Sequence, residues 1–385
     1  MLSIYLQSSA ALLLHWSMAL VAALAGLSPA APATPTSPTA EHQIYLPLVT
    51  QPGVVASKGG IWLTQAEIAA LPVSGAAWEN LKARADESAG APDLSDQSND
   101  TNVHILAKAL VYARTGEARY QQEVIAALRV VTYNHTEEGG RTLALGRELA
   151  AYVIAADIID LAHSDAKLDH DFRDKLRELL TKPLEGWNSV PRTLQDTHEL
   201  RPNNWGTHAG ASRLAIALYL GDTAEVERSA LVFRGYVGDF AAYHGFNYDD
   251  DLSWQANPAQ PVGINPVGTA KSGQSIDGAL PEEMRRGGSF QWPPLETNYP
   301  WEALQGAVVQ AALLDRAGYP AWEWQDQALL RAVQFLYNIG WPAQGDDEWI
   351  PPLINCVYGA SFPVAAKVHP GKNMGWTDWA HEKCR

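Results

Sequence analysis

Cysteine is scarce in this sequence, which holds only Cys356 and Cys384 among its 385 residues. Two thiols are too few for a Cys-based zinc or iron–sulfur site, and no His-Glu-x-x-His motif is present. We therefore expect no metal and no cofactor, with an ion held by the acidic run 249–251 as the alternative. In an oxidising compartment the two cysteines could form a disulfide that fixes the C-terminal segment.

Clusters of Lys and Arg are also missing. The chain has 28 Lys and Arg against 43 Asp and Glu, which gives a formal net charge of −15. Nucleic-acid-binding domains need a basic patch or stripe, so nucleic acid is excluded as a partner. An anionic ligand can bind only where the fold creates a locally positive cleft.

Alternating patterns typical of β-strands are nearly absent, whereas apolar residues recur at helical spacing from Trp62 onward. This pattern predicts an all-α fold. Short connections predict antiparallel helix pairs, and the lack of a fixed-period repeat favours a toroid over a solenoid. The predicted helices are 75–89, 101–115, 117–132, 142–162, 167–185, 204–220, 222–240, 300–318 and 322–339.

The N-terminus has the composition of a targeting segment. An apolar stretch over 10–26 is followed by small residues suited to signal peptidase, which predicts a signal peptide over 1–33 and a Pro- and Thr-rich linker over 34–57. The protein is therefore expected to be secreted, extracellular or periplasmic, and free of the membrane after cleavage. The first nine residues contain no Lys or Arg, which leaves a different start or an uncleaved anchor as alternatives.

Residues 203–208 read Asn-Asn-Trp-Gly-Thr-His and open a predicted helix. If the helix begins near Asn204, then Asn204 and His208 lie on one face and could meet the same ligand group. Gly206 leaves room for a ligand, and the free N–H groups of a helix start suit a carboxylate. The competing interpretation is a simple cap by Asn203 above a buried His208.

Residues 243–299 lack the helical period and are rich in Gly, Pro and Asn, which is typical of a functional segment. Pro300 suits the first turn of a helix, so Tyr299 is predicted to lie just outside it, free to project into a cleft. The alternatives are that Tyr299 packs a helix entrance and that His244 only closes a helix end.

Two arginines in this segment, Arg285 and Arg286, stand beside Gly287 and Gly288 and could bind a carboxylate bidentately. A solvated surface pair is the competing interpretation. The segment also carries acidic residues that suit either carboxylate catalysis or a solvated face. They are Asp249, Asp250, Asp251, Glu282, Glu283 and Glu296.

Several strings of the sequence together resemble one family. They are Trp62-Leu63-Thr64, 67–72, 102–116, Gly146-Arg147-Glu148, 203–206 and 372–379. They are similar to the alginate lyase superfamily, and most of all to the helical-toroid lyases of polysaccharide lyase family 38, which act on mannuronan, alginate and glucuronan. The resemblance covers nearly the whole chain after residue 58.

The resemblance implies an incomplete (α/α) toroid over 58–385 that acts, as a monomer, on an anionic polysaccharide. By position, Asn204, His244, Tyr299 and Arg286 match the amide, histidine, tyrosine and arginine of the family's catalytic cleft, with Arg285 as the other candidate arginine. The remaining candidates for substrate binding are Asn203, His208, Arg285, Tyr243, Trp205 and Glu296.

Such residues suit β-elimination on 1,4-linked polyuronates. Asn204 and an arginine would neutralise the uronate carboxylate as charge builds on it after loss of the C5 proton. Tyr299 could act as base and acid on mannuronate or glucuronate, where the C5 hydrogen and the C4 oxygen share one side of the ring. Guluronate would need His244 as the base and Tyr299 as the acid.

Two other functions remain open. A glycoside hydrolase on a similar helical toroid would use a pair of the carboxylates named above. A secreted glycan-binding protein without catalysis would use the aromatic supply, which includes 14 Trp and 14 Tyr, although most aromatic residues serve the core.

Overall fold

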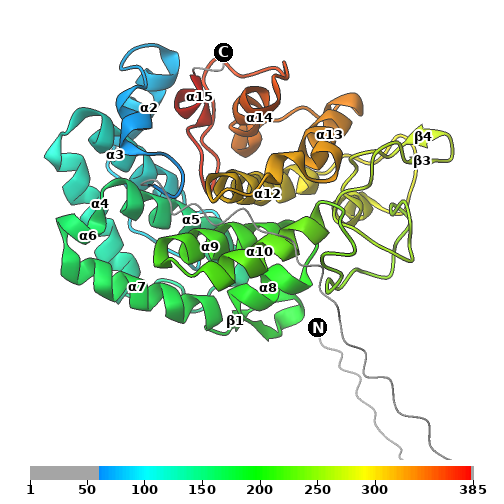
Figure 1. Cartoon of the computed structure of the whole chain (residues 1–385), viewed down its shortest axis with the longest axis horizontal. Coiled ribbons are helices and arrows are strands. Elements are labelled where there is room, and N and C mark those ends of the chain that lie inside the picture. Colours follow the sequence, from blue (N-terminus) through cyan, green and yellow to red (C-terminus); the bar gives the residue numbers. More distant parts are fainter. Residues whose placement is uncertain (1–59, 383–385) are drawn as a thin grey trace, which may run out of the picture. The chain divides into compact units, whose positions relative to one another are not determined.

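The computed structural model describes residues 60–382 (Figure 1). All described residues belong to one compact unit. The predicted signal peptide, the predicted linker and Cys384 lie outside the described residues. Cys356 lies on a described helix, and its disulfide with Cys384 stays a prediction.

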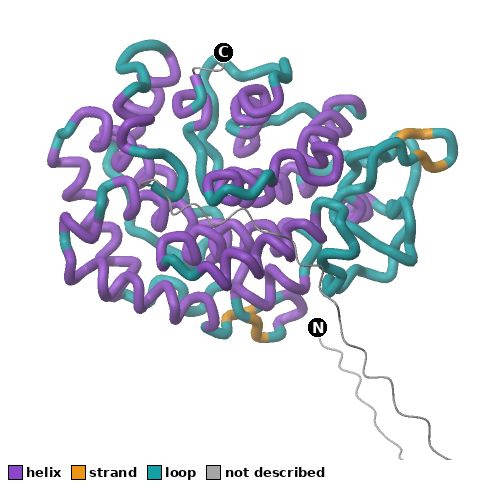
Figure 2. The backbone as a smooth tube through the Cα atoms, viewed as in Figure 1, coloured by secondary structure: helices purple, strands orange, loops and turns teal. Residues whose placement is uncertain are grey.

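Helices account for most of the described residues, with short antiparallel strand pairs between them (Figure 2). The helices are α1 (Gln65–Ala69), α2 (Ala76–Asp86), α3 (Thr101–Thr115), α4 (Ala118–Tyr133), α5 (Thr142–Ile158), α6 (Leu161–Ser164), α7 (Ala166–Thr181), α8 (Leu194–Leu200), α9 (Asn204–Leu220), α10 (Thr223–Tyr236), α11 (Pro281–Met284), α12 (Tyr299–Arg316), α13 (Trp324–Asn338), α14 (Ile350–Tyr358) and α15 (Thr377–Ala380). The strands are β1 (Leu184–Glu185), β2 (Pro191–Arg192), β3 (Ala270–Lys271) and β4 (Gln274–Ser275).

The predicted all-α class is confirmed, and α3 and α9 begin and end where the sequence predicts. The predicted helix 142–162 is wrong at its end, because the chain breaks after α5. Asp160 adopts a left-handed conformation with φ 51° and starts the short α6. Helices α1, α8, α11, α14 and α15 are absent from the sequence-based prediction.

Three central helices pack closely, with α9 between α5 and α12. Nearly every residue of α5 and α9 is buried, so neither helix shows the one-sided pattern of a surface helix. Gly146 on α5 and Gly306 on α12 face the backbone of α9 so closely that a Cβ at either position would overlap it. These glycines let the backbones approach and set the position of the first turn of α9.

Surface helices cover this central group with one apolar face each. On α7 the buried face includes Leu168, Phe172, Leu176 and Leu179, which follow the helical period. Helix α4 packs against α7, and α10 packs against α9.

The C-terminal helices pack against the N-terminal helices. Helix α12 contacts α14, α14 contacts α15, and α15 contacts α2, which packs on α3 (Figure 1). Trp379 on α15 fixes this return, because its ring lies 5.7 Å from that of Trp78 on α2 and its Nε1 donates to Pro72 O at 3.0 Å.

The segment between α10 and α12 is mostly loop, as predicted (Figure 2). It contains the β3–β4 hairpin, in which Ala270 pairs with Ser275, and the short α11. Buried Asn265 organises the loop, since its Nδ2 donates to Trp254 O at 2.9 Å and its Oδ1 accepts from Ala256 N at 3.1 Å. Among residues 60–382, no helix has both the length and the apolar character needed to cross a bilayer.

Candidate active site

The first turn of α9 is the centre of the candidate site. Asn203 is the N-cap residue, and its Oδ1 accepts from Trp205 N at 3.1 Å. Asn204 is the first helical residue, so the predicted helix start is confirmed. Asn204 Oδ1 also accepts from Trp205 N, at 3.0 Å. Among the described residues, the side-chain Nδ2 of Asn204 has no hydrogen-bond partner and can donate to a ligand.

The start of α9 binds a carboxylate, which belongs to the side chain of Glu283 and not to a ligand. The backbone N–H of Asn204 donates to Oε1 of Glu283 on α11. Negative charge is favoured at this end of a helix, so Glu283 occupies the place that the sequence suggested for a ligand. The interpretation of Gly206 as room for a ligand is wrong, because a Cβ there would overlap the carbonyl oxygen of Arg201.

Glu283 links the helix start to an arginine and a tyrosine. Arg286 Nε lies 3.1 Å from Glu283 Oε2, and the guanidinium of Arg286 lies 4.1 Å from the centre of the Tyr299 ring. Tyr299 is 40% exposed, whereas Glu283 and Asn204 are buried. Three of the four predicted catalytic residues are therefore linked: Asn204 and Arg286 both contact the buried Glu283, and Tyr299 contacts Arg286.

Burial raises the pKa of Glu283 to about 7, against the opposing effects of Arg286 and the N–H of Asn204. Glu282 and Glu302 add to the rise through charge repulsion. Glu283 therefore titrates close to neutral pH while in contact with both Asn204 and Arg286. From the sequence, Glu283 is predicted only as one of several carboxylates that a glycoside hydrolase could use.

The two arginines have different partners. Arg285 Nε donates to Glu282 Oε2 at 3.0 Å, and its Nη2 lies 2.9 Å from Asp249 Oδ2. No described contact joins Arg285 to Tyr299, so Arg286 is the arginine of the cluster.

Tyr299 itself lies one position further into the helix than predicted. Helix α12 begins at Tyr299, with Asn298 as the N-cap residue and Pro300 at the second position. The expectation of a non-helical Tyr299 is therefore wrong. The first turn of α12 leaves its ring partly exposed and in contact with Arg286.

A second ion pair extends the cluster to α5. Arg147 Nη1 donates to Glu302 Oε2 at 3.0 Å, and Glu302 follows Tyr299 by three positions on α12. Arg147 Nη2 also lies 3.8 Å from Asp346 Oδ2. In the sequence analysis, Arg147 appears only within a string that resembles the family, and Glu302 is not predicted to be a site residue.

His208 lies behind Asn204 and is fully buried. Its Nδ1 lies 2.9 Å from Asn373 Nδ2, and its Nε2 has no partner among the described residues. Burial and the charge of Arg147 hold the pKa of His208 well below its usual value, so the ring is neutral. His208 therefore supports the site from inside and presents no exposed edge to a polymer.

The other predicted site residues do not join the cluster. His244 is exposed and stacks on Phe240 with a centroid distance of 5.2 Å. Tyr243 donates its hydroxyl to Glu199 O at 2.6 Å and so fixes the end of α8. Trp205 is partly buried on the first turn of α9, and Glu296 is exposed, with no contact to the cluster among the described residues.

A buried Glu–Lys pair beside His208 is a further feature that the sequence did not single out. Lys372 Nζ lies 3.2 Å from Glu148 Oε1. Burial raises the pKa of Glu148 to about 8. The pair fixes the segment that carries Asn373, the partner of His208.

The described residues contain one group with the spacing of a metal site, His135, Glu137 and Glu138. Lys175 and Lys182 both donate to Oε1 of Glu137, so ammonium groups already neutralise it. In the run 249–251, Asp249 pairs with Arg285, and Asp251 Oδ1 accepts from Ser253 N at 2.9 Å.

A comparison with known protein families matches part of the chain. Residues 82–242 match the family model described as alginate lyase. The chain is accordingly an enzyme of the polysaccharide lyase class, whose substrates are anionic polysaccharides. Within that class, residues 82–242 are similar to the alginate lyase superfamily.

The matched range contains Arg147, Asn204 and His208 and ends before Glu283, Arg286 and Tyr299. A comparison with curated proteins finds no match.

Proposed function

We propose that the enzyme cleaves 1,4-linked polyuronates of the mannuronate or glucuronate type by metal-free β-elimination. The carrying observation is the stack of Arg286 on Tyr299 at 4.1 Å, beside the start of α9. The identity of the class makes elimination the reaction to explain, and it replaces the hydrolase and the non-catalytic alternatives.

Tyr299 is the proposed proton carrier. As phenolate it takes the C5 proton of the uronate, the C4–O4 bond breaks, and a C4=C5 double bond forms. The phenol then gives its proton to the departing O4, so that no water is consumed. A phenolate needs a nearby cation, and the Arg286 guanidinium against the ring supplies one.

Asn204 and Arg286 are the proposed neutralisers of the substrate carboxylate. The side-chain Nδ2 of Asn204 and the guanidinium of Arg286 are both donors on residues that contact Glu283, and we propose that both bind the carboxylate as it takes up charge. Glu283 positions them, because it receives the Asn204 N–H and pairs with Arg286.

The substrate preference follows from the position of His244. Guluronate carries the C5 hydrogen and the C4 oxygen on opposite sides of the ring and needs a second proton carrier. His244 packs on Phe240 and has no described contact with Tyr299 or Arg286. We therefore propose elimination on one side of the ring by Tyr299 alone, as mannuronate and glucuronate permit.

We also propose the narrower assignments that the resemblance implies. These are polysaccharide lyase family 38, a secreted monomer and an incomplete (α/α) toroid. The sequence of contacts from α12 through α14, α15 and α2 to α3 supports the toroid.

A panel of polymers tests the proposal. Polymannuronate and glucuronan should yield unsaturated ends that absorb in the ultraviolet, whereas polyguluronate should yield few. Equal activity on polyguluronate would contradict a single proton carrier.

A further inference from the structure

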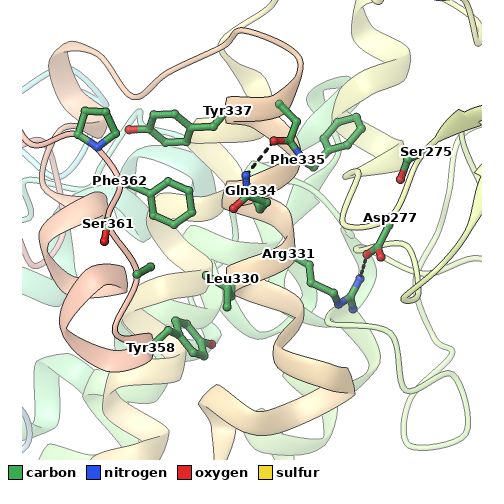
Figure 3. Close-up of a pocket in the computed structure, with 13 residues that line it drawn as sticks. Ser275, Asp277, Leu330, Arg331, Gln334, Phe335, Tyr337, Tyr358, Ser361 and Phe362 are labelled. Atoms are coloured by element: carbon green, nitrogen blue, oxygen red, sulfur yellow. Dashed lines mark hydrogen bonds and ion pairs between the residues drawn. The ribbon is translucent and has the colours of Figure 1, made fainter.

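One pocket among the described residues shares no residue with the candidate active site. Its volume is about 700 Å³, within the ~300–1,000 Å³ typical of small-molecule sites. It lies against α13, with Tyr358 and Phe362 on one side and Ser275 and Asp277 of the β3–β4 hairpin segment on the other (Figure 3).

One wall of the pocket is aromatic and preorganised. The rings of Phe362 and Tyr337 stack with a centroid distance of 4.8 Å and an interplanar angle of 29°. Asn355 holds the backbone of Phe362 at both groups, since Phe362 N donates to Asn355 Oδ1 at 2.8 Å and Asn355 Nδ2 donates to Phe362 O at 2.9 Å. Gly359, at φ 64° after α14, turns the chain back toward α13. The ring is therefore fixed before any ligand arrives.

The floor of the pocket carries exposed amides. Gln334 Nε2 donates to Asn338 Oδ1 at 2.8 Å along α13. This bond fixes both side chains and leaves Gln334 Oε1 as an acceptor and Asn338 Nδ2 as a donor. The hydroxyl groups of Ser275 and Ser361 line the rim. Donors and acceptors around an aromatic face match the hydroxyl groups and the C–H face of a pyranose.

The pocket is electrically balanced. Arg331 Nη1 lies 2.5 Å from Asp277 Oδ1, and Arg331 also donates to the carbonyl groups of Asn265, Gln325 and Asp326. Arg331 is the one Arg or Lys among the residues that line the pocket, and these contacts occupy its guanidinium group. The pocket therefore has no arginine or lysine free to bind a carboxylate. This distinguishes it from the cluster at Arg286 and Tyr299.

We infer that this pocket is a second saccharide-binding site, and that it takes neutral hexose units rather than the uronates of the cleaved polymer. Such a site would hold the enzyme on a neutral glycan that accompanies the acidic one. The inference stands apart from the proposed reaction, because no residue of the pocket takes part in it.

Titration calorimetry with the whole protein tests the site. The probes are neutral hexasaccharides of glucose and of mannose, with hexamannuronate as the acidic probe. We expect a neutral probe to bind, with little dependence on salt because no charge is neutralised. Phe362→Ala should weaken this binding roughly tenfold or more, through loss of the stacking face.

Tyr133→Ala is the matched control, since Tyr133 is an exposed aromatic residue on α4. It should leave binding unchanged, and thermal unfolding of both variants checks their folding. Gln334→Ala provides a second variant that removes a polar contact without touching the aromatic wall. The inference is overturned if no neutral probe binds, if Phe362→Ala and Gln334→Ala bind as well as the wild type, or if only hexamannuronate binds.

Discussion

The guanidinium group of Arg286 lies 4.1 Å from the centre of the Tyr299 ring, at the start of α12. Glu283 holds the other side of Arg286, with 3.1 Å between Oε2 and Nε. A buried carboxyl group, a guanidinium group and a partly exposed phenol are thus joined by successive contacts. This order places the positive charge where a phenolate and a substrate carboxylate both need it.

Tyr299→Phe removes the proposed proton carrier and keeps the ring that packs on Arg286. We expect kcat to fall by about 10²–10⁴, because the base and the acid are lost together, with little change in KM. Initial rates from ultraviolet absorbance on polymannuronate measure this. Tyr133→Phe, which removes an exposed hydroxyl on α4, should retain full activity.

Arg286→Lys and Arg285→Lys separate the two neighbouring arginines. Lysine keeps the charge but cannot stack and bind bidentately in the same way. We expect Arg286→Lys to lower kcat/KM by about 10²–10³, as for loss of a transition-state donor. Arg285→Lys should change it far less, since Arg285 pairs with Glu282 and Asp249. Equal losses in the two variants would remove Arg286 from its proposed role.

Glu283 should make stability depend on pH. Burial raises the pKa of Glu283 from 4.5 to about 7, so the folded protein keeps a proton that the unfolded chain has already released. By linkage, this group lowers the free energy of unfolding as pH rises from about 4.5 to about 7. Glu283→Gln removes that dependence.

Urea unfolding of the wild type and Glu283→Gln at about pH 5 and about pH 8 tests this linkage. The stability of the variant relative to the wild type should be higher at the upper pH. A difference that stays constant between the two pH values would contradict the raised pKa.

Gly306→Ala tests the close approach of α12 to α9. A Cβ at this position meets the backbone at Thr207, which cannot move without shifting the first turn of α9. We expect a loss of about 1–3 kcal/mol in the free energy of unfolding. Gly210→Ala meets only the end of the Gln310 side chain and should cost less. Equal costs would mean that α9 can adjust its position.

The helical fold could be predicted because its signals are local. The Asn203 cap marked the start of α9, and Gly116 ends α3 in a left-handed conformation with φ 76°. Helix α14 was missed because Pro351 and Pro352 suggest a break, although both stand in its first turn.

The candidate site could be predicted only in part, because its contacts are long-range. Asn204, Arg286 and Tyr299 each stood out beside a helix start or a flexible glycine. Glu283, the shared partner of Asn204 and Arg286, lies 79 positions from Asn204, and nothing local distinguishes it from Glu282. Arg147 and Glu302 are 155 positions apart and meet only through the packing of α5, α9 and α12.

The mass of the products from polymannuronate tests the central claim most directly. Elimination by Tyr299 predicts oligomers whose new non-reducing end lacks one water relative to a saturated uronate, formed by the wild type and almost absent with Tyr299→Phe. Products that all carry the added water, or an undiminished yield of unsaturated products from Tyr299→Phe, would contradict it.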